Sequence, residues 1–418
     1  MTIFKNYANK VLLFVFLISL FNYIDRQVLF AVFPLIKEEL ALSDVRLGML
    51  GSAFMIVYMC VAPFTGYIGD RIKRPGIIGV SAIVWSIATL AGGLSGNYGQ
   101  LLAARSIVGI GEAGYGTVSP SYLAEWFPKD IRARILAIYA LAIPVGSAIG
   151  YILGGWLGGH FGWREAFYIV AVPGILLGIY FLFFRETPER EAEDKRASLP
   201  EYLSLLKNRT FLLICLAESV ATFSVGGLAA WMPSFFERTF GLSVAKAGLY
   251  FGALTVLGGI TGTLAGGWFA DRLRKHTCRA YFITGFFSLV LAAPFGIAAV
   301  FASSLVWSLA MIFLAEFFVF AYSGPYHAAI VEAVPLEVRS MAFAVEIFII
   351  HALGDAISPV VLGKISDMTS SLGIAIVVSM VYLLAGGAVS LLAGRTWEKQ
   401  LNSKAGCGSQ KQDIQAGA

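Results

Sequence analysis

The chain has 418 residues, of which 58% are hydrophobic and 14% are charged, and its formal net charge is +5. Soluble domains average about 45–50% apolar and about 25% charged residues, so the composition excludes an ordinary soluble protein. The basic residues lie in short segments between apolar runs rather than on one basic face, which excludes a nucleic-acid-binding domain.

Twelve apolar runs are long enough to cross a bilayer, which takes about 20 residues. They cover residues 11–36, 47–69, 76–95, 99–127, 133–158, 166–184, 210–235, 247–270, 280–301, 304–333, 341–366 and 371–394. The first run carries Asp25 and Arg26 and lacks a small-residue cleavage site, so it is not expected to be a cleaved signal peptide. The sequence therefore predicts an all-α membrane protein with twelve transmembrane helices.

Lysine and arginine are unevenly divided between the segments that connect these runs. With both termini in the cytoplasm, the cytoplasmic segments hold 23 of them and the outer segments hold six. Because basic residues concentrate on the cytoplasmic side, this topology is predicted. The cysteines (Cys60, Cys215, Cys278 and Cys407) match no metal motif. We expect no disulfide, no metal and no cofactor.

A polar stretch at 185–209 separates two six-span halves, predicted at 1–184 and 210–394. Within the stretch, Ser198 and Glu201 have the spacing of a capping box, which predicts a short amphipathic cytoplasmic helix. The tail 395–418 is polar and rich in Gly, Ser and Gln, so we expect it to be disordered.

The two halves repeat one another. The pattern Gly66-x-x-x-Asp70-Arg71 recurs as Gly267-x-x-x-Asp271-Arg272, and Pro128-Lys-Asp-Ile-Arg132 recurs as Pro335-Leu-Glu-Val-Arg339. A duplicated six-span unit is typical of transporters that alternate access around a site between their halves.

These residues resemble the major facilitator superfamily, whose most widespread signature is similar to Gly66–Arg74, except that Lys73 stands where a glycine is usual. Residues 20–190 resemble its Spinster-like lipid transporters, through Asn22–Arg26, Arg105–Tyr115 and Ala142–Tyr151. The resemblance implies two six-helix bundles around a cavity. We further expect a monomer in a bacterial inner membrane. Carriers of sugar acids also have Asn-Tyr-x-Asp-Arg in the first span.

Four charged residues lie deep within the spans of the first half, away from the span ends: Asp25, Arg26, Arg105 and Glu112. A charge at the bilayer centre costs about 2.5–3.5 kcal/mol or more, so each needs a partner, a proton or water. At about 1.5 Å per residue, Asp25 and Glu112 both lie near the midplane. We expect Arg26 or Arg105 to bridge to Glu112 and leave Asp25 to titrate. A permanent structural salt-bridge network is the alternative.

Away from the span ends, the second half has acids and a histidine within its spans but no Lys or Arg. They are Glu218, Glu316, Glu346, His351 and Asp355. Glu316 follows Glu112 by about the repeat offset, so we expect it, with Tyr115, among the substrate-binding residues. This asymmetry favours an amphiphile, with charges for its head and apolar lining for its tail, although any membrane cavity is partly apolar.

Glycines spaced four apart mark two spans: Gly146, Gly150, Gly154 and Gly158 in the fifth, and Gly258, Gly262 and Gly266 in the eighth. Small residues at this spacing allow close helix approach. In the superfamily spans five and eight meet across the halves, so we expect these strips to give either simple close packing or a sliding contact between them.

The repeated loops also carry charges that the resemblance assigns to a cytoplasmic gate. The predicted gating residues are Gly66, Asp70, Arg71, Arg74, Arg132, Arg134, Asp271, Arg272 and Arg339. Positive loops would be needed for topology in any case, but the acid Asp70 contributes nothing to that rule. In the superfamily this cluster latches the cytoplasmic side, and Asp70 would cap the eleventh span.

The first hypothesis is therefore a secondary transporter, not an enzyme, that moves a lysolipid-like or sphingoid amphiphile coupled to protons at Asp25 or Glu112. The second is a proton symporter of a small organic anion bound by Arg26 or Arg105. A membrane receptor or scaffold is a third, which would need neither buried charges nor a duplicated gate. No P-loop is present, so ATP-driven pumping is not supported. Expected partners are the substrate, protons and membrane lipids.

Overall fold

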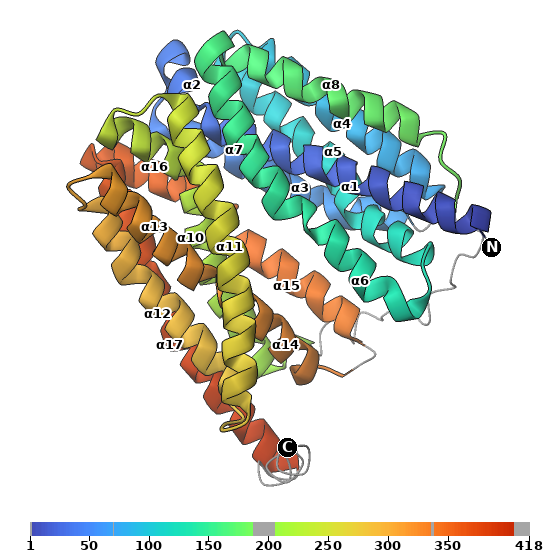
Figure 1. The fold of residues 1–418 in the computed structure, drawn as a ribbon, viewed down its shortest axis with the longest axis vertical. Helices are drawn as coiled ribbons and strands as arrows, with labels where there is room; N and C mark the ends of the chain where they lie inside the picture. Colours follow the sequence, from blue (N-terminus) through green and yellow to red (C-terminus); the bar gives the residue numbers. More distant parts are fainter. Residues whose placement is uncertain (1, 70, 187–204, 336–337, 405–418) are drawn as a thin grey trace. The chain divides into compact units, whose positions relative to one another are not determined.

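The structure, a computed structural model, describes residues 2–69, 71–186, 205–335 and 338–404. All regular structure within these ranges is helical. The helices, labelled in Figure 1, are α1 (Thr2–Ala31), α2 (Phe33–Leu40), α3 (Asp44–Gly69), α4 (Arg74–Gly93), α5 (Tyr98–Glu125), α6 (Lys129–Ala140), α7 (Ala142–Phe161), α8 (Trp163–Phe181), α10 (Arg209–Phe240), α11 (Val244–Arg274), α12 (Ala280–Val300), α13 (Leu305–Phe320), α14 (Ser323–Ala333), α15 (Arg339–Leu353), α16 (Ser358–Thr369) and α17 (Leu372–Lys404).

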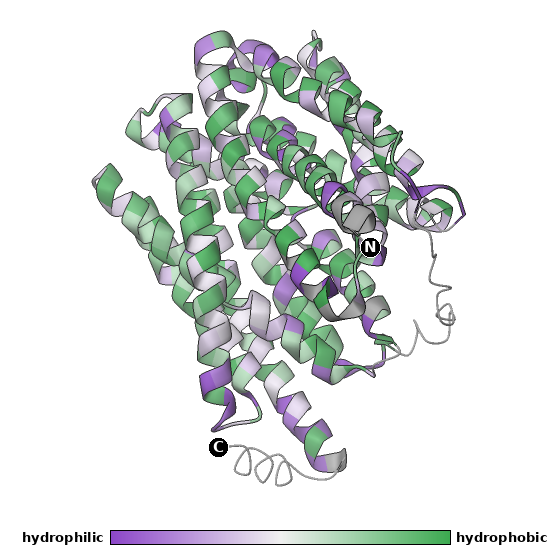
Figure 2. Ribbon diagram, turned by 45° about the vertical axis from the view of Figure 1, so that its right-hand side comes forward, coloured by the Kyte–Doolittle hydropathy of each residue, from purple (hydrophilic) through white to green (hydrophobic). Residues whose placement is uncertain are grey.

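Eleven helical segments of the described chain are long and apolar enough to cross a membrane. The twelfth predicted span is α5, which has 28 residues but is diluted in hydropathy by five glycines and by Arg105 and Glu112. Some spans comprise two helices in succession, as in α6–α7, α13–α14 and α15–α16. Apolar residues run along the helices and hydrophilic residues gather near helix ends (Figure 2). The prediction of an all-α, twelve-span protein is confirmed.

A proline and a glycine lie at two of the helix breaks. Pro34 lies in the first turn of α2, where its missing N–H and fixed φ are tolerated. Gly354 ends α15 with φ −107° and ψ −105°, outside the helical region. A Cβ there would lie 2.3 Å from the carbonyl oxygen of Ile350. Only a residue without a side chain fits, so Gly354 sets the break before α16.

By its contacts the chain divides into two units, which are described separately. The first contains residues 1–193, 229–253 and 359–372, and the second contains 194–228, 254–358 and 373–418. The C-terminal end of α10, the N-terminal end of α11 and most of α16 thus pack with the first six spans. The two-bundle division at 1–184 and 210–394 stays a prediction.

The predicted glycine strips lie in close packing against neighbouring helices, the first of the two alternatives given above. Gly146, Gly150 and Gly154 lie against the backbone of α1, where added Cβ atoms would meet Leu20, Ile24 and Val28 at 2.7–2.8 Å. Gly258 and Gly262 lie against α13, and Gly266 lies against Ala321 just beyond its end. The glycines lie on these helix faces because the backbones of the two packed helices are in contact there and leave no room for a side chain.

Helices α7 and α11 do approach closely, but through other glycines. A Cβ on Gly155 would lie 2.6 Å from the Val244 oxygen, and one on Gly248 would lie 2.2 Å from the Tyr151 oxygen. The Tyr151 hydroxyl donates to the carbonyl oxygen of Ala229, 2.8 Å away. The contact between spans five and eight therefore exists in the first unit, at Gly155, next to the predicted strip of span five, and at Gly248, ten residues before the predicted strip of span eight.

Substitution of Gly262 by alanine is expected to destabilise the second unit. The added methyl would lie 2.1 Å from the carbonyl oxygen of Phe317, and overpacking of this kind costs about 1–3 kcal/mol. Gly267→Ala is the matched control, because nothing lies within 4 Å of its Cβ position. Thermal unfolding in detergent should give a lowered midpoint only for Gly262→Ala. Equal midpoints would show that α11 and α13 separate without cost.

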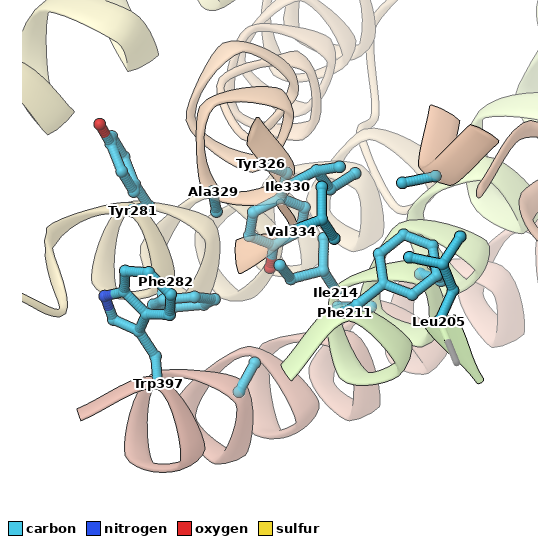
Figure 3. Packing of buried hydrophobic residues seen from close by; sticks show 14 of the residues in the cluster. Leu205, Phe211, Ile214, Tyr281, Phe282, Tyr326, Ala329, Ile330, Val334 and Trp397 are labelled. Atoms are coloured by element: carbon cyan, nitrogen blue, oxygen red, sulfur yellow. The ribbon is translucent and has the colours of Figure 1, made fainter. Parts of the chain in front are cut away.

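The second unit has a continuous apolar core beneath its predicted cytoplasmic end. Phe211 and Ile214 of α10 pack near Tyr326 and Ile330 of α14 (Figure 3). Trp397 of α17 joins the same core, 6.5 Å from the Phe282 ring. This packing holds α17 helical to Lys404, which corrects the prediction that disorder begins at 395. The predicted linker helix from Ser198 falls largely outside the described residues, as do 405–418.

Candidate transport site

The four charged residues of the first-half spans come together inside the first unit. Arg26 Nε lies 2.5 Å from Glu112 Oε2, which confirms the predicted bridge between α1 and α5. Asp25 points elsewhere and accepts hydrogen bonds from the Thr89 hydroxyl at 2.7 and 2.8 Å. Arg105 Nη1 lies 3.8 Å from Asp25 Oδ2. Each carboxylate thus has its own arginine.

The pairing also gives Asp25 a partner, because Arg105 faces it rather than Glu112. Whether Asp25 titrates stays a prediction. Neighbouring residues on a helix point about 100° apart, so Asp25 and Arg26 reach different partners. Thr89 on α4 was not identified from the sequence, since a single threonine in an apolar span is a weak signal.

Aromatic rings surround the Arg26 guanidinium. Its central carbon lies 4.9 Å from the ring centres of Tyr23 and Phe54 and 5.4 Å from that of Tyr58. Such contacts stabilise a cation in a poorly hydrated place. The Arg26 side chain is 17% exposed, whereas that of Glu112 is fully buried. Arg26 is therefore the member of this pair that keeps an open side.

The network has hydrogen-bonding capacity to spare. Arg105 Nε and Nη1 and Glu112 Oε1 are buried without a hydrogen-bond partner in the described structure. Buried polar groups are nearly always hydrogen-bonded. An arginine with two unused N–H directions can take an anionic group or water, and the network can also change its pairings.

Tyr115, which was predicted to bind substrate, packs within the first unit. Its hydroxyl donates to the carbonyl oxygen of Val15 at 2.8 Å, and its ring meets Trp85 edge-on at 5.5 Å. The hydroxyl is occupied by backbone, so its geometry gives the substrate role no support.

The second unit holds its intramembrane acids in a different way. Glu316 Oε1 accepts a hydrogen bond from Thr255 at 3.2 Å. His351 Nδ1 lies within hydrogen-bond distance of Asp355 Oδ1, 2.8 Å away, at the break between α15 and α16. Glu218 and Glu346 are buried near His327 on α14, a histidine that the sequence analysis did not single out.

Only some of the predicted gating residues make contacts among the described residues. Arg74 pairs with Glu125 at 2.5 Å, and its backbone N–H donates to Glu186. Arg132 donates to the Phe127 carbonyl oxygen. Asp70 lies outside the described residues, so its role stays a prediction. Arg71 donates to the Tyr67 carbonyl oxygen. Three further predicted gating residues are exposed: Arg134, Asp271 and Arg272. Arg339 is the first residue of α15.

A second ion cluster, not anticipated from the sequence, lies at the start of α3, at the end opposite to Gly69. The buried Asp44 carboxylate accepts from both Arg238 Nη atoms, at 2.7 and 2.8 Å, and from Lys37 and Ser366, each at 2.6 Å. Asp367 on α16 accepts the first two backbone N–H groups of α3 at 2.9 Å. We call Asp44, Lys37, Arg238, Ser366 and Asp367 the Asp44 cluster.

The Asp44 cluster joins α3 to the end of α10 and to α16. Backbones also touch there, because a Cβ on Gly48 would lie 2.2 Å from the Pro359 oxygen and one on Gly363 would lie 2.4 Å from the Asp44 oxygen. The sequence feature that could have indicated this cluster is the position of Asp44 at the start of a span, where the helix dipole stabilises an acidic side chain.

Comparison with known proteins places this chain in a family. The Major Facilitator Superfamily sequence profile matches residues 15–359. The chain is 32% identical over 381 residues to protein spinster homolog 1 of Xenopus laevis, covering 85% of this chain and 72% of that protein. It is 31% identical over 370 residues to the sphingosine-1-phosphate transporter SPNS2 of Xenopus tropicalis, with 84% and 72% covered. Protein spinster of Drosophila melanogaster is 32% identical, but the match spans only 60% of its length.

Solved structures agree with these relatives. A bacterial homologue of the human lysosomal transporter Spinster, in an inward-facing and unoccupied conformation, superposes with a TM-score of 0.85 at 26% identity, covering 94% of this chain and 98% of that chain. A D-xylose-proton symporter shares the fold at 17% identity and a TM-score of 0.75. The chain belongs to the major facilitator superfamily of membrane transporters, and its relatives there are the Spinster proteins.

Proposed function

We propose that this protein carries a lysolipid-like or sphingoid amphiphile across the membrane by alternating access, coupled to protons. The observation that carries the proposal is the network of Asp25, Arg26, Arg105 and Glu112 in the first unit. Two arginines and two acids share a buried space there, and Arg105 has unused donors. A phosphate or carboxylate head is the ligand that such arginines recognise.

Proton coupling follows from competition for the same arginines. While both carboxylates are ionised, Arg26 and Arg105 each hold one of them. Protonation of Asp25 or Glu112 removes a negative charge and frees an arginine for an anionic head. Binding of the head and binding of a proton then favour each other, because each removes the cost of an uncompensated charge.

The relatives support an amphiphile over a small anion. One relative is named a sphingosine-1-phosphate transporter, and away from the span ends the ionisable groups in the second half are acids and histidines without Lys or Arg. A sugar acid would need polar contacts around its whole surface. We also propose that the protein is a monomer in a bacterial inner membrane, with both termini on the cytoplasmic side. This topology puts the Asp44 cluster on the outer side.

Transport by purified protein in proteoliposomes tests the proposal. Wild type should take up a fluorescent lysophospholipid at a rate that depends on the pH gradient, and should not take up gluconate. Asp25→Asn should retain uptake but lose most of its pH dependence, because the titrating group is gone. Glu38→Gln, which removes an exposed acid of α2, is the control. Uptake of gluconate alone would favour the organic-anion symporter, and unchanged pH dependence in Asp25→Asn would place the coupling site elsewhere.

A further inference from the structure

Two buried acids of the second unit face each other without a basic partner among the described Lys and Arg residues. Glu218 lies on α10 and Glu346 on α15, and each residue is only 2% exposed. One oxygen of each and a nitrogen of His327 lie within 4.8 Å of one another. The described Arg ion pairs of this unit are made by other acids, Glu332 and Glu398.

The surroundings of the acid pair contain no permanent cation among the described residues. The titratable groups that act on it are Cys215 on α10, Tyr322 and Tyr326 at the start of α14, and His351 on α15. His351 is engaged by Asp355 at 2.8 Å. Glu218 Oε2 is buried without a hydrogen-bond partner in the part of the chain that the structure describes. Nothing in this set neutralises two negative charges.

Electrostatics then limits what the pair can hold. Two carboxylates at this separation in a medium of low dielectric cannot both remain ionised, and the usual outcome is one shared proton. A divalent metal is the other neutralising ligand, but structural zinc sites have four protein ligands and this cluster offers three. The orphaned Glu218 oxygen is the position that a proton donor would satisfy.

We propose that Glu218 and Glu346 form a proton-binding pair in the second unit, with His327 as the group that exchanges the proton with solvent. His327 is exposed, although its two neighbours are buried, and it packs edge-on against Phe343 at 5.8 Å. Histidine is the side chain suited to relay protons near neutral pH. Because the two acids lie on different helices, proton occupancy depends on the distance between α10 and α15.

Infrared difference spectroscopy of the purified full chain tests the pair directly. Wild type should show a protonated carboxyl C=O band, and the Glu218→Gln and Glu346→Gln variants should each lose the band at that frequency, because the remaining carboxyl no longer shares its proton with a second acid. Glu332→Gln is the matched control, because that carboxylate pairs with Arg274 at 2.5 Å and should not contribute. His327→Gln should keep the band but slow its shift in D₂O about tenfold or more, as expected if the relay near neutral pH is lost.

Each outcome decides the proposal, independently of transport. Loss of the same band in both glutamate variants supports it. If one variant fails to fold, the other serves alone, since either removes the pair. An unchanged band in a folded variant would overturn the proposal, as would a metal ion that copurifies at one equivalent with wild type and is absent from Glu346→Gln. An unchanged exchange rate in His327→Gln would overturn the part assigned to His327.

Discussion

Replacing Glu112 by glutamine is expected to reduce transport at least tenfold and to lower stability by about 3–5 kcal/mol, the typical cost of stripping a buried charge of its partner. Arg26 would lose the carboxylate that it contacts, 2.5 Å away, while its side chain stays mostly buried among three aromatic rings. Proteoliposome uptake and thermal unfolding should both show the loss. Normal uptake with a normal midpoint would contradict the assigned network.

The control for Glu112 is the same substitution in an exposed ion pair. Glu39 accepts hydrogen bonds from Arg164 and from Trp163, and these lower its pKa. Its side chain is 48% exposed, and exposed pairs contribute about 0–1 kcal/mol, so Glu39→Gln should behave almost as wild type. The exchanged pair Arg26→Glu with Glu112→Arg should recover part of the lost stability, because the charges again match.

Replacing Asp44 by asparagine is expected to open the end of the molecule that we propose to be outer. The neutral amide would leave Arg238 and Lys37 without the carboxylate that they share. Their side chains are 27% and 36% exposed, so water compensates in part and we expect a loss of roughly 2 kcal/mol, as for a hydrogen bond to a charged group. That amount shifts a two-state population about thirtyfold.

Spin labels at Arg46 and Met368 would measure the opening, because both side chains are exposed and they flank the Asp44 cluster on α3 and α16. The label distance should lengthen in Asp44→Asn. Lys246→Gln, which removes an exposed basic residue outside the cluster, is the control and should leave the distribution unchanged. A wild-type distribution in Asp44→Asn would reduce the cluster to a packing feature.

The fold could be predicted from the sequence because bilayer length and hydropathy allow few alternatives. The twelve runs and the repeated Gly66 and Gly267 patterns specify the spans and the duplication. Contacts between helices were harder to predict. The strip of Gly146, Gly150 and Gly154 has the spacing of an interface, but spacing does not identify the partner, which is α1.

The sequence was enough to select the residues of the candidate site, but it was not enough to predict which of them pair with one another. Buried charges are conspicuous in apolar spans, so Asp25, Arg26, Arg105 and Glu112 could be selected by cost alone. Which arginine meets which acid depends on how each helix is rotated about its axis, and a sequence does not contain these rotations. The Asp44 cluster was missed because its members are far apart in the chain and each resembles an ordinary loop charge.

The Asp44 cluster has a consequence for how the protein responds to its surroundings. Two acids, Asp44 and Asp367, and two bases, Lys37 and Arg238, meet there, so the assembled cluster carries no net charge from them. When the cluster separates, the four groups enter water, where dissolved ions screen each of them within about 8–10 Å at physiological ionic strength. Added salt should therefore favour the separated cluster, and in the topology that we propose its state would follow the ionic strength outside the cell.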